Sequence, residues 1–471
     1  MNYFRGNAKA FVFLAALFVV TISAHFFVII NPGFFNHDEW QRYDHIYSYN
    51  FWHFVETVGR LRAGKEFGAP VRPLGFIQQG FSAIFMVSNP WITHLIDVLI
   101  HFADMLVFYL LLTRLGVDRI LRNVAALLFV LSPLGIFATA WVGASFDRLY
   151  VLFSMMAIYF ALGILQDKKN RLQTSDRKLG AVILNGVGLF ICAFLAIISK
   201  ETALMLPVLI VVGCVCMNGS VGIGQLLRDK YFYFISLLAG VPILIFLIIR
   251  APAIYNTLFV YASPEYSPQL SFLCRNVLYY FAYPFYWGTS DMYSMLVEAK
   301  MPAFVAVLVH FSVVYLLAWR ASFKISLAYI SLYFVFLFPV IFLQSISAHY
   351  LYSTTPVLSL ALAYLICDFI KTKRHMLLVV LGIIILFSLY RFSQIQIVFY
   401  EDGVCQVKYI STLDESLVHA RALKPIMTVN IQGETGAKLY VASVLCLGAV
   451  KMVLTKVWFS LQIQIIQLVM T

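Results

Sequence analysis

The chain has 471 residues, of which 62% are hydrophobic and only 12% are charged, and its mean hydropathy is +0.86. Soluble domains are about half apolar and about a quarter charged, so this composition excludes a water-soluble globular protein. The formal net charge is +12. In a soluble chain this excess could indicate nucleic-acid binding, but in a membrane protein Lys and Arg collect in cytoplasmic loops. The sequence has no P-loop, GxGxxG motif or zinc-type cysteine spacing, and we expect no nucleic-acid partner.

Continuous apolar runs, often about 20 residues long, predict transmembrane helices rather than the alternating strands of a membrane barrel. The first run is too long for a typical signal-peptide core, and no small-residue cleavage site follows it, so we interpret it as a retained anchor. We therefore predict an all-α polytopic membrane protein with about eleven transmembrane helices. The apolar runs are 11–30, 91–113, 120–140, 147–165, 181–199, 201–217, 231–249, 301–319, 325–343, 351–370 and 376–396.

The short loops between these runs alternate in charge. One set is rich in Lys and Arg, whereas the alternate turns carry little more than Arg148 and Lys200. The positive-inside rule then places the N-terminus in the cytoplasm and the other set of turns outside. We predict a membrane domain over 1–396 and a small extracytoplasmic region over 397–471, whose apolar end either joins an outer domain or adds membrane-associated segments. Two long outer loops, 31–90 and 250–300, belong to the membrane domain.

The densest group of ionisable side chains follows the first apolar run, in the stretch FFNHDEWQRYDH over 34–45. An aspartate beside a substrate hydroxyl can take its proton as the oxygen attacks. Asp38 is therefore the candidate general base, and Glu39 is a neighbouring carboxylate that would orient a substrate or a metal. The alternative is a solvated loop start in which Asp38 caps a helix.

The same stretch offers ligands of the kind that divalent cations take. The spacing of these side chains selects no coordination geometry, so we favour a site without metal and leave a divalent ion open. The candidate ligands are His37, Asp38 and Asp44, with Glu39 and His45 beside them.

Other polar groups also fall on the predicted outer face, where a charge beside the bilayer is a candidate for function. Arg72 precedes Pro73, and its guanidinium could bind a phosphate through two parallel hydrogen bonds or extend toward lipid headgroups. Lys200 and Glu201 form a tight turn between two apolar runs. This pair either neutralises itself or supplies a cation for a phosphate, and the pair Asp147 and Arg148 in the preceding outer turn poses the same choice.

His349 and Tyr350 open the tenth apolar run. His349 is either an ordinary interfacial histidine or a hydrogen-bond donor to a phosphate oxygen. In the second interpretation Tyr350 would line a pocket for a lipid or a sugar.

The second apolar run carries four ionisable residues at helical spacing, which places them on one stripe of the helix. Such a stripe could be the proton path of a secondary transporter or flippase, a different class of function. We favour a polar face turned toward the interior of the helix bundle. The four residues are His94, Asp97, His101 and Asp104.

The order of these signals resembles the GT-C superfamily of membrane glycosyltransferases. An outer loop with Asp-Glu follows the first span, and RPL, SKETALMLP and HYLYSTTP come later in the chain. The pattern is similar to protein O-mannosyltransferases, aminoarabinose transferases and bacterial O-antigen glucosyltransferases over roughly residues 1–370. The resemblance implies that Asp38 and Glu39 are the acidic diad, with Arg72, Lys200 and Glu201 at the family's other motif positions. His349 stands where the family has an arginine.

The resemblance further implies a sugar donor linked to a polyprenyl phosphate and an active site on the extracytoplasmic face. We expect transfer to a surface glycan or its lipid-linked precursor, as in O-antigen modification, in a bacterial inner membrane. Protein O-mannosylation and glycosylation of lipid A are the alternatives within enzymes. The expected partners are the lipid-linked donor, the glycan or lipid-linked acceptor, and membrane lipids.

Overall fold

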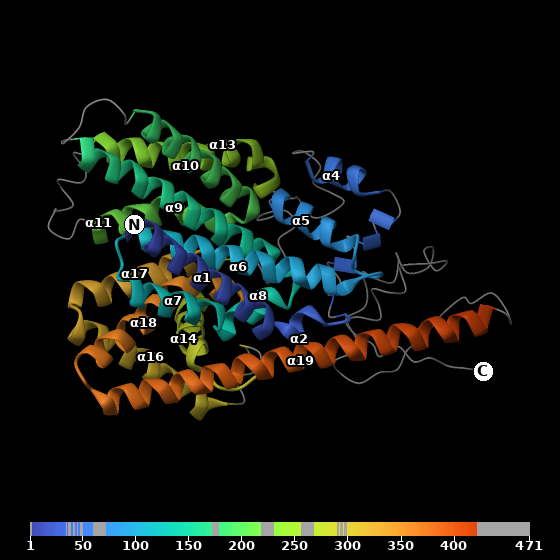
Figure 1. The fold of residues 1–471 in the computed structure, drawn as a ribbon. Helices are drawn as coiled ribbons and strands as arrows, with labels where there is room; N and C mark the ends of the chain where they lie inside the picture. The colour runs from blue at the N-terminus through green and yellow to red at the C-terminus, as the bar shows by residue number, and fades with distance from the viewer. Residues whose placement is uncertain are drawn as a thin grey trace.

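The computed structural model describes residues 2–33, 35, 39–40, 43–44, 46–47, 50–59, 72–171, 179–217, 230–255, 268–289, 292, 295 and 299–421. Every regular element within these residues is an α-helix or a short 3₁₀ helix (Figure 1), which confirms the predicted all-α class. The 3₁₀ helices are η1 (Val142–Ala144), η2 (Glu201–Met205), η5 (Leu270–Phe272), η6 (Tyr283–Phe285) and η7 (Ala348–Thr354). The α-helices are α1 (Asn2–Ala24), α2 (Phe26–Ile29), α4 (Phe51–Gly59), α5 (Pro73–Ala83), α6 (Pro90–Arg114), α7 (Arg119–Val130), α8 (Pro133–Thr139), α9 (Ser145–Arg171), α10 (Leu179–Ser199), α11 (Leu206–Met217), α13 (Lys230–Tyr255), α14 (Leu273–Ala282), α16 (Lys300–Arg320), α17 (Phe323–Leu337), α18 (Thr355–Lys371) and α19 (His375–Arg421).

Each of the eleven predicted runs coincides with an apolar helix or helix pair of the described chain. Helices α7 and α8 are long and apolar enough to cross a membrane only when they are counted as one segment, and the chain bends by 50° between them. Three apolar helices, Ala10–Ala24, Glu201–Gly213 and Phe323–Leu337, are shorter than a full span. Seven described segments are long and apolar enough to cross a membrane on their own: Pro90–Arg114, Val142–Gln166, Gly180–Ser199, Lys230–Pro252, Lys300–Arg320, Ala348–Lys371 and His375–Thr412.

Local chemistry explains where several of these helices begin. Pro73, Pro90 and Pro133 are the first residues of α5, α6 and α8. Proline is favoured at this position because the missing N–H would have no partner within the helix. Asp118 caps α7, and its carboxylate accepts hydrogen bonds from the backbone N–H groups of Ile120 and Leu121 at 2.9 and 3.4 Å.

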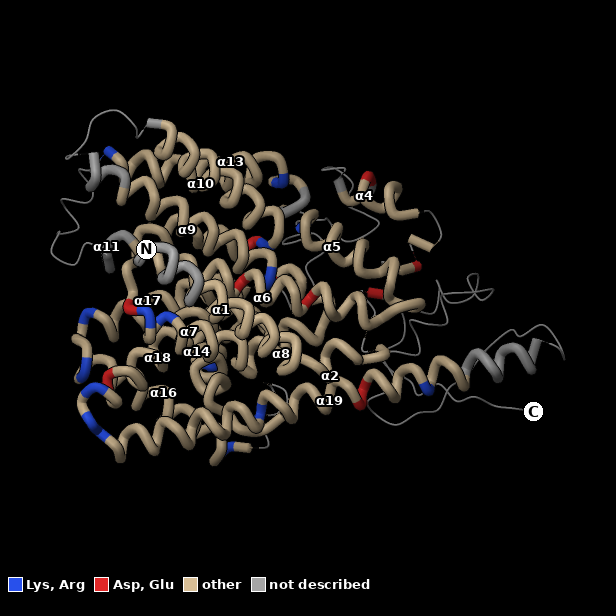
Figure 2. The backbone as a smooth tube through the Cα atoms, viewed as in Figure 1, with Lys and Arg blue, Asp and Glu red and all other residues tan. Residues whose placement is uncertain are grey.

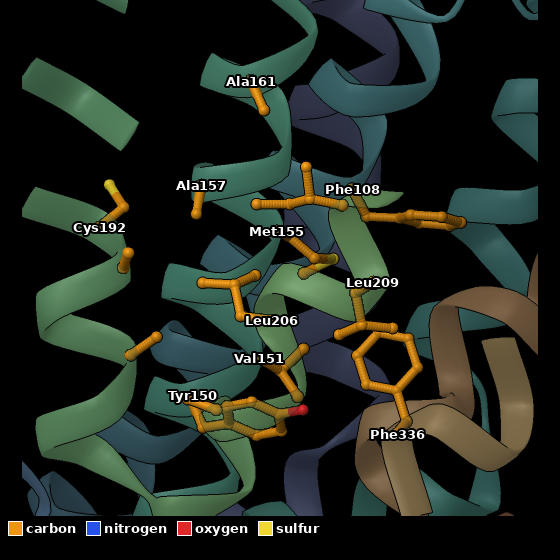
Figure 3. Close-up of a cluster of buried hydrophobic side chains, with 14 of the residues drawn as sticks. Phe108, Tyr150, Val151, Met155, Ala157, Ala161, Cys192, Leu206, Leu209 and Phe336 are labelled. Carbon is orange, nitrogen blue, oxygen red and sulfur yellow. The ribbon is translucent and has the colours of Figure 1, made fainter. Parts of the chain in front are cut away.

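The larger apolar core lies where α9 packs between α6, α10 and α11 (Figure 3). Small residues of α9, such as Ala157 and Ala161, are fully buried there, and small side chains let helix backbones approach closely within a membrane. Leu209 of α11 and Phe336 of α17 close the same cluster. A second core joins α14, α16, α17 and α18.

The aromatic segment within the predicted second outer loop belongs to this second core. Tyr280 and Tyr283 of that segment are fully buried, and the Tyr333 hydroxyl of α17 donates to the Tyr280 carbonyl at 2.6 Å. The segment therefore packs into the bundle instead of lying free outside it.

Basic residues gather at one end of the bundle, where α16 meets α17 and α18 meets α19 (Figure 2). Arg320 closes α16 there, and its Nε donates to Asp368 of α18 at 2.7 Å. Lys371 ends α18, and Arg374 follows in the turn to α19. This is the end that the positive-inside rule predicts to be cytoplasmic.

Helix α19 passes through position 396 without a break and continues to Arg421. The predicted boundary between the membrane domain and the C-terminal region thus falls inside a helix. Residues 422–471 of that region lie outside the described residues.

The orientation can be tested by labelling cysteines in intact cells, in a background without the other cysteines. Cys274 is exposed in the segment that we predict outside, and Thr372 is exposed in the basic turn after α18. We expect a membrane-impermeant maleimide to modify Cys274 in intact cells and Thr372→Cys only after permeabilisation. The reverse pattern would place the N-terminus outside.

Candidate active site

Arg72 connects α5 to the turn between α10 and α11. Its Nε donates to Glu201 Oε2 at 2.7 Å, and its Nη2 pairs with Glu201 Oε1. The guanidinium also lies over the Phe146 ring, with Cζ 5.1 Å from the ring centroid. The Arg72 and Glu201 side chains keep 30% and 38% of their surface exposed. This bidentate pair is therefore charged, well oriented and accessible.

Lys200 lies deeper, next to the same pair. Its Nζ forms an ion pair with Asp147 at the start of α9 and lies 4.3 Å from the centroid of the Tyr350 ring. The Lys200 and Asp147 side chains are only 1% and 5% exposed. A buried charge is tolerated when it is paired, and a cation over an aromatic ring gains further stabilisation.

Burial and neighbouring charges shift the pKa values of the two cations in different directions. Burial lowers the pKa of Lys200, and the Asp147 carboxylate offsets only part of that shift. Burial also acts to lower the pKa of Arg72, but the Glu201 carboxylate outweighs it, and the pKa of Arg72 rises above its usual value. Arg72 is consequently the fixed positive charge of the site.

The 3₁₀ helix η7 brings His349 and Tyr350 to the same place. His349 Nε2 lies 3.8 Å from Asp147 Oδ2, and Ser347 Oγ lies 2.6 Å from His349 Nδ1. The imidazole packs edge-to-face against Trp141, with ring centroids 4.7 Å apart. Six side chains from four separate segments thus form one group, here called the charged cluster: Arg72, Asp147, Lys200, Glu201, His349 and Tyr350.

Glu39 contacts the segment that leads into α9. Its side chain is 2% exposed, and its Oε1 lies 2.6 Å from the position that a Cβ atom on Gly143 would occupy. Trp141 Nε1 lies at the same distance from that position. Gln79 Nε2 donates to the Gly143 carbonyl at 3.1 Å and holds η1 against α5. A Cβ atom at 143 would force the Glu39 carboxylate and the Trp141 indole to move away from this backbone.

The rest of the acidic stretch is only partly described. Asp38, His37 and His45 lie outside the described residues, whereas Asp44 is described and half-buried. Among the side chains that the structure does describe, no group of three or more His, Cys, Asp or Glu could hold a metal ion. The preference for a site without metal, with a divalent ion left open, therefore stays a prediction.

Arg148 points away from the charged cluster. It forms an ion pair with Asp97 of α6, and both side chains are fully buried. Gln78 Nε2 also donates to Asp97 Oδ1, at 3.2 Å. Arg148 therefore joins α9 to α6, while its neighbour Asp147 enters the cluster.

The other residues of the α6 stripe are also buried and hydrogen-bonded. The Tyr352 hydroxyl of η7 donates to Asp104 Oδ2 at 2.5 Å and lies 2.8 Å from His101 Nδ1. His94 Nε2 lies 3.0 Å from the Gly33 carbonyl. The stripe faces the interior of the bundle, as predicted, and Tyr352 uses it to anchor the segment that carries His349.

Sequence reasoning named Asp147 only as a pair with its neighbour Arg148, and it missed Trp141. Asp147 is adjacent to Arg148 in an outer turn, and the sequence alone does not show which of the two side chains enters the cluster. Trp141 gave no signal, because one tryptophan at the end of an apolar run is common at membrane interfaces.

No protein-family model matches the sequence, and no curated protein matches it. Among solved structures, the chain is similar to the crystal structure of ArnT from Cupriavidus metallidurans bound to undecaprenyl phosphate. The two share 13% sequence identity with a TM-score of 0.48, over 93% of this chain and 84% of that chain.

The Asp147–Lys200 pair gives a test of the cluster's energetics. Asp147→Asn keeps the size of the side chain but leaves Lys200 as a buried, unpaired cation. We expect a loss of about 3 to 5 kcal/mol in the free energy of unfolding, as for other broken buried pairs. Thermal unfolding of the purified protein in detergent would show the loss as a lower Tm.

The double variant Asp147→Asn/Lys200→Met is the control for this measurement. It removes the unpaired cation, so we expect it to recover part of the lost stability. Equal Tm values for the single variant and the wild type would show that the pair is not coupled.

Proposed function

We propose that the chain is a GT-C membrane glycosyltransferase that transfers a sugar from a polyprenyl-phosphate donor to a surface glycan or its lipid-linked precursor. The reaction takes place at the extracytoplasmic end of the bundle, in a bacterial inner membrane. The polytopic fold is consistent with a donor that arrives within the lipid.

The observation that carries the proposal is the charged cluster. Two cations, Arg72 and Lys200, meet at the end of a bundle whose outer surface is apolar. The planar guanidinium of Arg72 matches the geometry of a phosphate and is partly exposed. A donor phosphate would replace Glu201 at one edge of the Arg72 guanidinium. Lys200 would supply a second positive charge from the buried side of the cluster.

The acidic diad supplies the other half of the chemistry. In the proposed step, Asp38 takes the proton of the acceptor hydroxyl, and the oxygen forms a bond to the anomeric carbon. The bond from that carbon to the phosphate oxygen breaks, and the polyprenyl phosphate leaves with the electron pair. One displacement inverts the anomeric configuration. Glu39, next to Asp38 in sequence, lies against η1 and is linked to the cluster by Trp141 and His349.

His349 replaces the arginine expected from the family pattern, and its surroundings support a different role. The ring lies between Trp141 and Asp147, and the His349 side chain is 11% exposed. An imidazole carries a full positive charge only at low pH. Arg72 and Lys200 therefore supply the positive charge for the phosphate, and His349 positions the Asp147 carboxylate and the Trp141 ring.

The acceptor is a surface glycan in this proposal, and protein O-mannosylation and lipid A glycosylation are the enzymatic alternatives. A transporter is supported less well. The sequence feature that most favoured a transporter was the α6 stripe. All four residues of this stripe, His94, Asp97, His101 and Asp104, form contacts within the bundle.

The first test is the mass of the surface glycan repeat unit in the native host. We expect one sugar mass to disappear when the gene is deleted and to return with the wild-type gene. Asp38→Asn should not restore it, because an amide cannot take the proton of the acceptor hydroxyl. Membrane levels of the two proteins must be equal.

Identical repeat-unit masses in the parent, deletion and both complemented strains would contradict a glycan acceptor. Labelled donor incubated with protein and lipid A fractions would then identify the acceptor, and absence of transfer to any of them would contradict the transferase itself.

Arg72 and Arg148 form a matched pair of arginines with opposite expected outcomes. Arg72→Gln should reduce kcat/KM for the donor by about 10- to 150-fold, the equivalent of one lost hydrogen bond to a charged group, with little change in Tm. Arg148→Gln should lower the Tm, because it leaves Asp97 buried without its ion-pair partner. An Arg72→Gln protein with wild-type kinetics would remove Arg72 from the phosphate site.

A further inference from the structure

Helix α19 is much longer than a membrane span requires. Its apolar part, His375–Thr412, has 38 residues and is about 57 Å long at 1.5 Å per residue. The hydrocarbon core is only about 30 Å thick. Because α19 begins at the basic turn, it passes α2 and α8 near its middle, and its C-terminal part extends beyond the other helices (Figure 1). This is the side where the first outer loop begins.

The extended part of α19 holds the start of that loop by its backbone. The side-chain amide of Gln406 accepts from the Phe35 N–H at 3.1 Å and donates to the Phe35 carbonyl at 2.8 Å. Asn31 Nδ2 donates to the Phe399 carbonyl at 2.9 Å. Gln406 and Asn31 are 3% and 0% exposed. Each amide therefore bonds to a backbone group of the other segment.

Two glycines allow α19 and the segment after α2 to approach closely enough for these hydrogen bonds. A Cβ atom on Gly33 would lie 2.7 Å from Gln406 Oε1 and 2.9 Å from the Gly403 carbonyl oxygen. A Cβ atom on Gly403 would overlap Asn31 Oδ1. We call this contact the clasp. It is formed by Asn31, Gly33 and Phe35 on one side and by Phe399, Gly403 and Gln406 of α19 on the other.

The clasp is connected to the acidic diad by a short path of packed side chains. Phe35 packs with Trp40, Met86 and Val142 in one buried cluster, against which Ile410 of α19 also lies. Val142 precedes Gly143, the residue that Glu39 contacts. Phe35 itself is three residues before Asp38 in the sequence.

We propose that the clasp is a positioning device. Gln406 and Asn31, which lie on two distant segments, fix the position of the first residues of the first outer loop. This position sets how far the Asp38–Glu39 diad reaches toward the charged cluster. This proposal rests on the proposed transferase function. The clasp residues touch neither Arg72 nor Lys200 in any described contact, so the clasp acts on the step that needs the base and leaves the phosphate site unchanged.

The first test is Gln406→Ala, compared with Gln394→Ala on the same helix. Gln394 is half-buried, and it lies about three turns earlier on a different face of α19. We expect Gln406→Ala to lower kcat by about 10- to 100-fold, as for other small displacements of a catalytic group, with a donor KM within about twofold of wild type. Gln394→Ala should keep both constants. Unchanged kcat in Gln406→Ala, or a loss explained entirely by less folded protein, would overturn the proposal.

A reversible crosslink separates positioning from folding. In Asn31→Cys/Gly403→Cys/Cys405→Ser, the new Cβ at 403 would lie 2.9 Å from the former Asn31 Cγ, which brings the two Cβ atoms within range of a disulfide. We expect low kcat when the protein is reduced and recovery of kcat when it is oxidised. Equal kcat values in the two states would overturn the positioning role.

The crosslink also distinguishes this proposal from the function on which it rests. Disulfide formation can be read on a denaturing gel without any assay of sugar transfer. A wild-type protein that transfers no sugar, together with efficient crosslinking, would contradict the transferase and leave the clasp in place. Failure of the two cysteines to crosslink would contradict the clasp itself.

Discussion

A charge inside a lipid-embedded bundle must be paired, and this requirement organises the structure around the site. Asp147 with Lys200 joins α9 to the turn after α10, and Asp97 with Arg148 joins α6 to α9. Because α9 provides one member of each pair, adjacent residues on its first turn hold two different neighbours. The bundle can thus carry charges close to its core, at one end, without leaving any of these four unpaired.

The two short 3₁₀ helices η2 and η7 bring motif residues into the charged cluster. Each lies directly before an α-helix, and each carries motif residues at its start, Glu201 in η2 and His349 in η7. Tyr352 holds η7 through Asp104. Motif residues therefore sit directly before a helix, while hydrogen bonds inside the bundle fix their direction.

Sequence reasoning predicted the helices well, because the length of an apolar run directly reflects the thickness of a bilayer. It also selected Arg72, Lys200, Glu201, His349 and Tyr350, which the structure brings together. Three features required coordinates. Whether Asp147 or Arg148 faces the cluster depends on helix rotation, the need for glycine at 143 depends on an approach from another segment, and the continuation of α19 past 396 depends on packing that polarity alone does not encode.

The distance along the chain between the two sides of the clasp has a consequence for biosynthesis. Phe35 and Gln406 are 371 residues apart, and ribosomes add about 5 to 20 residues per second. The first outer loop is therefore made roughly 20 to 75 s before the residue that fixes its entry. During this interval the earlier helices can insert and pair their charges, but the loop has no partner on α19. The clasp is thus among the last contacts to form in the maturation of each molecule.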